Sequence, residues 1–342
     1  MQRFSYVTAE TVADAIAWAV KTPGARFLAG GTTLVDLMKS GPEHPSLVID
    51  INRLPDLDHI SYDRTKGILQ FGALARMSAI AADGDVRQGC PSIAEALLFA
   101  ASGQLRNMAS IGGNLLQRTR CVYFRDRSFP CNKRDSGSGC GAMDGENRNL
   151  AVLGTSEHCI ANYAGDFAVA LSALDGIIHA SGPTGERVIS ATDFHLLPRD
   201  TPHVETVLQP GELITAIEVP ISNLSRTSHY LKIRDRSSYE FASVSVAVAA
   251  DLDTDGNMRD VRLALGGLAA KPWRAFAAEE YLRGRSIRDR QAMLAAAELT
   301  LKGATLQKGN RYKIEQARAG VTRAFRFLES VPRPPVADGR SN

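Results

Sequence analysis

The sequence predicts an α+β fold of two domains, because the pattern of apolar residues that marks strands and helices changes once along the 342 residues. Short strand and helix patterns alternate through the first 110 residues, which is typical of a mixed α/β unit. Strand patterns with tight turns, and then helices, follow a boundary predicted at 221–227. We therefore expect a first domain at 1–222, a smaller second domain of helices on an antiparallel sheet at 227–328, and a flexible tail at 329–342.

The apolar periodicity assigns each expected element. In the first domain it predicts helices at 13–20, 34–38, 93–101 and 167–174, and strands at 26–29, 47–51, 68–72, 177–180 and 213–219. In the second domain it predicts strands at 230–233, 242–250 and 261–266, and helices at 275–282, 288–303 and 311–328. An Asp255-Gly256 turn is expected to join two of these strands.

Between 117 and 160 the apolar periodicity disappears, and Gly, Ser, Asn, Arg and Cys dominate. A segment of this length without regular structure is uncommon inside a compact domain. Its glycines, which include Gly137, Gly139, Gly141 and Gly145, cannot build a core. We therefore expect a bound group to order this segment.

The composition excludes several classes of protein. A net charge of +3 lacks the concentrated positive charge that nucleic-acid binding requires. No apolar run is long enough to cross a membrane, so no membrane partner is expected. Residues 1–10 lack the pattern of a secretory signal. We expect a chain that is cytoplasmic, or periplasmic through co-export with a signal-bearing partner.

A first glycine turn suggests a phosphate site. A short strand ends at two glycines, and hydroxyl residues then open a helix. Glycines let backbone amides approach a ligand closely, and the amides at a helix start favour an anion such as a pyrophosphate. An ordinary tight turn between strand and helix is the alternative. The segment consists of Phe27, Leu28, Ala29, Gly30, Gly31, Thr32, Thr33 and Leu34.

A second glycine turn repeats this chemistry about 80 residues later. It reads Ser110-Ile111-Gly112-Gly113-Asn114, with hydroxyl and amide donors beside paired glycines. Either turn alone is weak evidence for a ligand. Together, Ser110, Gly113 and Asn114 could hold one end of an extended cofactor whose other end meets the first turn.

These two turns, in this order, resemble the pyrophosphate loops of the FAD-binding subunits and domains of molybdenum hydroxylases, the family of xanthine dehydrogenase. Three further motifs agree: Gly165-Asp166-Phe167-Ala168, Gly211-Glu212-Leu213-Ile214, and the stretch that begins at Lys232. The resemblance covers about residues 1–328. It implies a two-part FAD domain of the vanillyl-alcohol-oxidase and CO-dehydrogenase flavoprotein type. It also implies that Asp166 and Leu213 contact FAD and that Lys232 lies near the flavin ring.

Four cysteines in the irregular segment point to a metal. Their spacing contains no zinc knuckle and no ferredoxin run, so it does not select the metal. The segment resembles the insertion of periplasmic-type aldehyde oxidoreductases, which implies a [4Fe-4S] cluster. Zinc, and unligated thiols or disulfides, are the alternatives, and Cys90 is expected to be structural. The predicted ligands are Cys121, Cys131, Cys140 and Cys159.

The segment also carries a cluster of basic residues, which we predict to form a solvated loop face. Compensation of an anionic cluster, or docking of an acidic acceptor protein, is the alternative. The residues are Arg118, Arg120, Arg125, Arg127, Lys133 and Arg134.

The resemblance implies an electron-transfer subunit of a heterotrimeric oxidoreductase. A large partner would oxidise an aldehyde at a molybdenum cofactor, and a small partner would pass electrons through [2Fe-2S] clusters to this FAD. A ferredoxin-like or other acceptor would receive them. Two alternatives stay open: a 4-hydroxybenzoyl-CoA reductase subunit and a zinc-stapled binding module without redox function. The seven histidines form no metal motif, and no catalytic side-chain pair is expected here.

Overall fold

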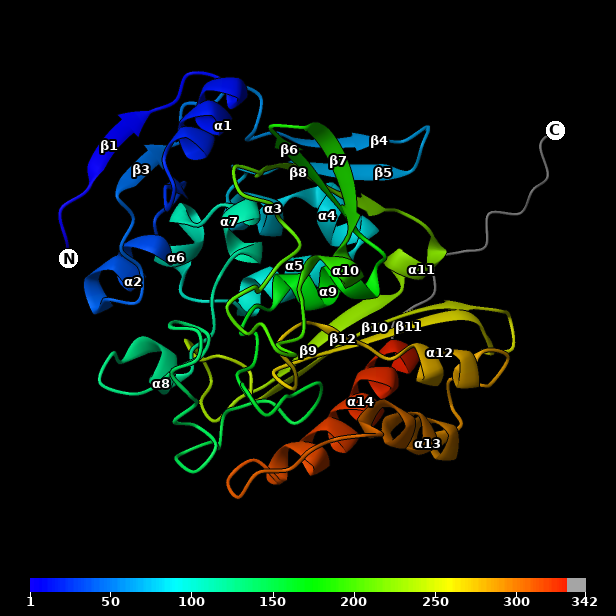
Figure 1. Ribbon diagram of the computed structural model, residues 1–342. Helices are drawn as coiled ribbons and strands as arrows, with labels where there is room; N and C mark the ends of the chain where they lie inside the picture. The colour runs from blue at the N-terminus through cyan, green and yellow to red at the C-terminus, as the bar shows by residue number, and fades with distance from the viewer. Residues whose placement is uncertain (331–342) are drawn as a thin grey trace.

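The computed structural model describes residues 1–330 as three sheets and the helices that pack on them (Figure 1). The predicted α+β fold is confirmed: strands and helices mix throughout, and two of the sheets are wholly antiparallel. Helix α14 extends two residues into the predicted tail, and residues 331–342 lie outside the described part of the chain.

The N-terminal sheet is small and parallel, with strand order β1-β3-β2. It buries Ile49 against Ala15 of α1, and this core continues to Leu213. Helix α2 begins directly after the first glycine turn. The elements are β1 (Ser5–Thr8), α1 (Val12–Lys21), β2 (Arg26–Leu28), α2 (Leu34–Ser40) and β3 (Leu47–Asp50).

The second sheet is antiparallel and has the order β4-β5-β8-β6-β7. Strand β8, which ends the first domain, lies between β5 and β6, so distant parts of the sequence close this unit. The strands are β4 (Ile60–Asp63), β5 (Ile68–Gly72), β6 (Ile177–Gly182), β7 (Gly185–Ser190) and β8 (Leu213–Pro220). The helices are α3 (Met77–Ala82), α4 (Gly84–Gly89), α5 (Pro91–Phe99), α6 (Gly103–Met108), α7 (Ile111–Leu115), α8 (Val122–Arg125), α9 (Phe167–Ala173), α10 (Ala191–Phe194) and α11 (Asn223–Arg226).

The third sheet is covered on both faces (Figure 1). Along β10, Ala247 and Ala249 join the core of the first domain, whereas Val246 and Val248 join the C-terminal core. Alternating side chains point to opposite faces of a strand, so burial of both faces explains the continuous apolar run. The elements are β9 (Ser228–Ile233), β10 (Val244–Leu252), β11 (Met258–Gly266), β12 (Trp273–Arg274), α12 (Phe276–Leu282), α13 (Arg290–Leu301) and α14 (Tyr312–Ser330).

The expectation that 117–160 has no core of its own is wrong. The segment forms a small apolar cluster around Tyr123 and Phe124, which also takes in the four cysteines and Leu37 of α2. The glycines contribute because they leave room for Tyr123: a Cβ at Gly145 would lie 2.0 Å from its hydroxyl, and one at Gly141 would lie 2.8 Å from its ring. The periodicity missed this core because its apolar residues come from turns and from α8, a helix of only four residues.

The same segment is tied to the C-terminal domain. The amides of Val152 and Leu153 both donate to the carbonyl of Leu268, over 2.8 and 2.9 Å. The buried ammonium of Lys313 on α14 donates to the carbonyls of Asn149 and Gly267. The two predicted domains are therefore joined through the insertion as well as through the shared sheet.

Candidate functional site

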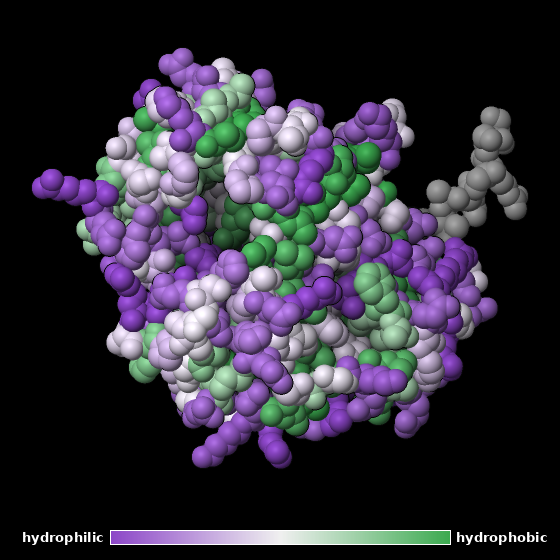
Figure 2. All heavy atoms as spheres, in the orientation of Figure 1, coloured by the Kyte–Doolittle hydropathy of each residue, from purple (hydrophilic) through white to green (hydrophobic). Residues whose placement is uncertain are grey.

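A cavity of about 1020 Å³ gathers most of the predicted cofactor residues. Both glycine turns line it, although about 80 residues separate them in the sequence. Figure 2 shows the surface hollowed beside α7, where this cavity opens. Eleven of the fourteen predicted residues contribute to its wall: Phe27, Leu28, Ala29, Gly30, Gly31, Thr32, Thr33, Leu34, Ser110, Gly113 and Leu213.

The first turn presents a row of unused backbone donors to this cavity. Within residues 1–330, the amides from Gly30 to Leu34 donate to no protein acceptor, and Thr33 caps α2 without a side-chain hydrogen bond. The backbone leaves no space for a side chain here, because a Cβ at Gly30 would lie 1.9 Å from the Met108 carbonyl oxygen. Gly31 adopts a φ of +70°, which favours glycine. This cradle fits the diphosphate of a dinucleotide.

The second turn contributes a hydroxyl more than backbone donors. The amides of Ile111 and Gly112 donate to the carbonyls of Ala75 and Ala73, so both are already used. Ser110 caps α7 by accepting from the amide of Gly113 over 3.3 Å. Its hydroxyl hydrogen is therefore free to donate to a ligand in the cavity.

Three predicted residues do not line the cavity: Asn114, Asp166 and Lys232. The side-chain nitrogen Nδ2 of Asn114 lies 3.4 Å from the Met77 sulfur. The side-chain oxygen Oδ1 of Asn114 is buried and has no hydrogen-bond partner within the described residues. Lys232 donates to Asp166 over 2.8 Å, and the hydroxyl of Tyr230 donates to the same carboxylate over 2.6 Å. Burial, and then the Asp166 charge, raise the pKa of Tyr230 well above its usual value, so this hydroxyl stays a donor.

The structure adds wall residues that the sequence analysis missed. The segment from His203 to Glu212 covers one side of the cavity, and Glu43, Leu116 and Arg118 line it as well. Leu116 and Arg118 follow the second turn closely, and Gly211 and Glu212 belong to the motif already noted before Leu213, whereas Glu43 and residues 203–210 belong to no such motif. Only the fold brings Glu43 and residues 203–210 to the cavity, so no local pattern could have identified them.

The four cysteines of the insertion belong to one cluster. Within it, the backbones of Cys131 and Cys140 pair through an antiparallel β-bridge. Burial raises the pKa of the Cys121 thiol to about 12 and that of Cys159 to about 11. Neighbouring thiols of the cluster raise these pKa values further, whereas Lys133 lowers that of Cys159. Bound cations are what stabilise several thiolates in such a place. Cys90 lies apart in the core of the first domain.

The thiols of this cluster are the chemical type of ligand that a metal site uses. Within the described residues, no group of three or more Cys, His, Asp or Glu side chains is already arranged to hold a single ion. Four cysteine thiols are a donor set that suits either a cubane iron–sulfur cluster or tetrahedral zinc.

Apart from Arg127, which is exposed, the basic residues of the insertion do not form the predicted solvated face. Arg134 donates to four carbonyls, from Tyr123, Phe124, Asp126 and Phe129, and Arg120 and Arg125 both pair with Asp36 of α2. Arg134 thus stabilises the loops of the insertion, and Arg120 and Arg125 attach the insertion to α2. Arginine suits this role because its planar group reaches several acceptors at once.

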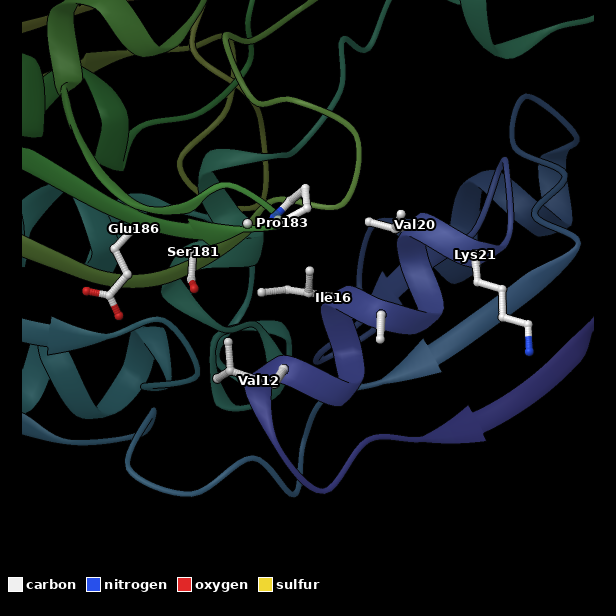
Figure 3. A pocket seen from close by; sticks show the side chains of 10 residues that line it. Val12, Ile16, Val20, Lys21, Ser181, Pro183 and Glu186 are labelled. Carbon is white, nitrogen blue, oxygen red and sulfur yellow. The ribbon is translucent and has the colours of Figure 1, made fainter.

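A second depression of about 600 Å³ lies between α1 and the β6–β7 hairpin (Figure 3). Val12, Ile16 and Val20 of α1 face Ser181 and Pro183 of the hairpin across it. It contains none of the predicted site residues, so the larger cavity is the candidate site.

The fold and the site define the chain as a flavoprotein module. The model of the FAD binding domain in molybdopterin dehydrogenase matches residues 2–222, and the CO dehydrogenase flavoprotein C-terminal domain matches residues 229–328. The chain therefore belongs to the FAD-binding medium subunits of the molybdenum hydroxylase family, which are oxidoreductase subunits.

Individual relatives agree with this assignment. The chain is 48% identical, over 82% of its length and 86% of the relative, to the aldehyde oxidoreductase FAD-binding subunit PaoB of Escherichia coli strain K12. It is 29% identical, over 84% of its length and 83% of the relative, to the glyceraldehyde dehydrogenase medium chain of Sulfolobus acidocaldarius. A CO dehydrogenase chain from Oligotropha carboxidovorans shares the fold, with a TM-score of 0.75 and 23% identity over 97% of this chain and 99% of that one.

Proposed function

We propose that this chain is the FAD- and [4Fe-4S]-binding electron-transfer subunit of a molybdenum-dependent aldehyde oxidoreductase. The observation that carries the proposal is the single cavity that unites both glycine turns. The 48% identity to a protein named as an aldehyde oxidoreductase subunit supports the choice of substrate class. We further propose that 1–222 is the FAD domain, with the insertion at about 117–160, and that 227–328 is the C-terminal domain.

The residues of the cavity have distinct roles toward FAD in this proposal. The unused amides from Gly30 to Leu34, with the hydroxyls of Thr32 and Thr33, would bind the diphosphate. Ser110 would donate to it from the opposite wall, and Leu213 would pack against the cofactor. Asp166 and Lys232 would stabilise the adjoining core as a buried ion pair. FAD, once bound, would accept and release electrons, and no side chain here carries out the oxidation itself.

The cysteine cluster would hold the [4Fe-4S] group through Cys121, Cys131, Cys140 and Cys159. Its position supports a role in electron transfer, because Leu37 lines the FAD cavity and also packs in the cysteine cluster. Leu37 therefore belongs both to the cavity wall and to the apolar cluster that contains the four cysteines. The insertion would thus place the cluster at the wall of the flavin site.

The partners follow from the family. A large subunit with a molybdenum cofactor would oxidise the aldehyde, and a small subunit with [2Fe-2S] clusters would conduct electrons to this chain in a heterotrimer. A ferredoxin-like or other acceptor would then be reduced. The complex would work in the cytoplasm, or in the periplasm if a signal-bearing partner exports it. No helix within residues 1–330 is long and apolar enough to span a membrane.

The test starts with the absorbance spectrum and the metal content of the purified protein. We expect flavin bands over a broad iron–sulfur shoulder, with one FAD and four iron atoms per chain. A colourless protein with stoichiometric zinc would overturn the proposal. Assay of the complex with aromatic aldehydes and with acyl-CoA thioesters then separates an aldehyde oxidoreductase from a 4-hydroxybenzoyl-CoA reductase, and we expect turnover of the aldehydes.

A further inference from the structure

A chain of alternating charges connects the FAD cavity with the cysteine cluster. Glu43, which is 8% exposed, pairs with both Arg26 and Arg118. Arg118 in turn pairs with Glu205, whose Oε1 lies 2.6 Å from Nη2 and 2.7 Å from Nε of the guanidinium. The other oxygen of Glu205 lies 3.7 Å from the ammonium of Lys133. A single carboxylate thus stands between two cations.

Each end of this chain of charges belongs to a different site. Arg26, Glu43, Arg118 and Glu205 all line the FAD cavity. At the other end, Lys133 is 5% exposed, follows Cys131 by two residues, and donates to the Pro202 carbonyl over 2.9 Å.

Arg118 contacts the core of the insertion as well. The guanidinium of Arg118 lies 4.4 Å from the centre of the Phe124 ring. Phe124 is fully buried in the apolar cluster that also contains the four cysteines. Charges in such a place are poorly screened by water, so their effects reach farther than those of surface ion pairs. Removal of one partner also leaves the other charge buried and uncompensated.

We propose that Glu205 is a positioning residue shared by both cofactor sites: it holds Arg118 in the wall of the flavin cavity and Lys133 beside the cysteine cluster. This inference rests on the proposed function, because it concerns how the two cofactors influence each other. The carboxylate opposes the addition of an electron at either site, whereas the two cations favour it. Glu205 therefore sets the redox equilibria of FAD and cluster together.

The experiment measures both midpoint potentials in the complex as purified from its host. The cluster is followed by its EPR signal and the flavin by its visible absorbance during reductive titration. In Glu205→Gln, which keeps the shape and removes the charge, we expect both potentials to rise. For the cluster the equilibrium constant of reduction should increase on the order of tenfold, which is 59 mV for a one-electron couple.

Three matched variants separate an electrostatic role from a merely structural one. Glu205→Asp keeps the charge and should restore the cluster potential. Lys133→Met removes a cation and should lower that potential. Glu186→Gln alters an exposed carboxylate of β7 and should change neither potential.

The inference is overturned if Glu205→Gln keeps both cofactors with unchanged potentials, or if Glu205→Gln and Lys133→Met shift the cluster in the same direction. If Glu205→Asp shifts the cluster as far as Glu205→Gln does, the role is structural and the inference also fails. A parent protein that contains neither flavin nor iron would refute the proposed function itself, so the two failures are distinguishable.

Discussion

The sharpest prediction concerns the first glycine turn. In Gly30→Ala, the new Cβ would lie 1.9 Å from the Met108 carbonyl oxygen, where an ordinary contact needs about 3.5 Å. Because the obstacle is backbone, the turn must move by roughly 1.5 Å. A hydrogen bond from an amide to a phosphate oxygen would not survive such a shift.

The size of the effect follows from the donors that are displaced. A hydrogen bond to a charged group contributes about 1.5–3 kcal/mol. Loss of one or two amide donors from the diphosphate should therefore weaken FAD binding by about 3 kcal/mol, or roughly 100-fold. The assay is reconstitution of flavin-free protein with FAD, followed by the quenching of flavin fluorescence.

A matched variant separates this effect from general damage to the fold. Gly84 begins α4, and a Cβ at this position would have no neighbour within 4 Å. Gly84→Ala should bind FAD like the parent protein. If Gly30→Ala keeps the parent affinity and the parent thermal stability, the assignment of this turn to the diphosphate is refuted.

Three further predictions follow from other parts of the molecule. Ser110→Ala should weaken FAD binding by about 1 kcal/mol, whereas Ser102→Ala, which removes a comparable helix cap outside the cavity, should leave it unchanged; equal losses would contradict the role of Ser110. Cys121→Ser should lower the iron content and Cys90→Ser should not, as measured by metal analysis; full iron in Cys121→Ser would count against its role as a ligand. Burial lowers the pKa of Lys313 from 10.5 to about 7. Between these two pH values the unfolded chain binds more protons than the folded chain. The free energy of unfolding should therefore fall as the pH drops from 10.5 to 7, by at most about 5 kcal/mol. Lys313→Met should flatten this dependence in urea unfolding, and an unchanged slope would contradict the burial argument.

Much of the fold could be predicted because its elements are encoded locally. The strand at β2, the glycine turn and helix α2 follow one another in the sequence, so a reading of neighbouring residues is sufficient to place them. The structure of the insertion could not be predicted in this way. Its apolar residues have no helical or strand period, and the fit of Tyr123 against two glycines appears only when the chain is folded.

In the candidate site, too, some features could be predicted from neighbouring residues and others could not. The two glycine turns were recognisable in the sequence, and the fold brings them into one cavity. The unused donors belong mainly to the first turn, because the carbonyls of Ala73 and Ala75 engage amides of the second. That difference depends on residues far away in the sequence, and no motif encodes it.

By itself, the sequence determined the α+β class, the paired glycine turns and the set of four cysteines, since each is a property of neighbouring residues. The tertiary structure alone decided that Asp166 pairs with Lys232 outside the cavity wall and that Glu205 joins Arg118 to Lys133. A hydrogen bond or an ion pair forms only where the folded chain brings its two partners within reach, which the composition of each segment does not specify.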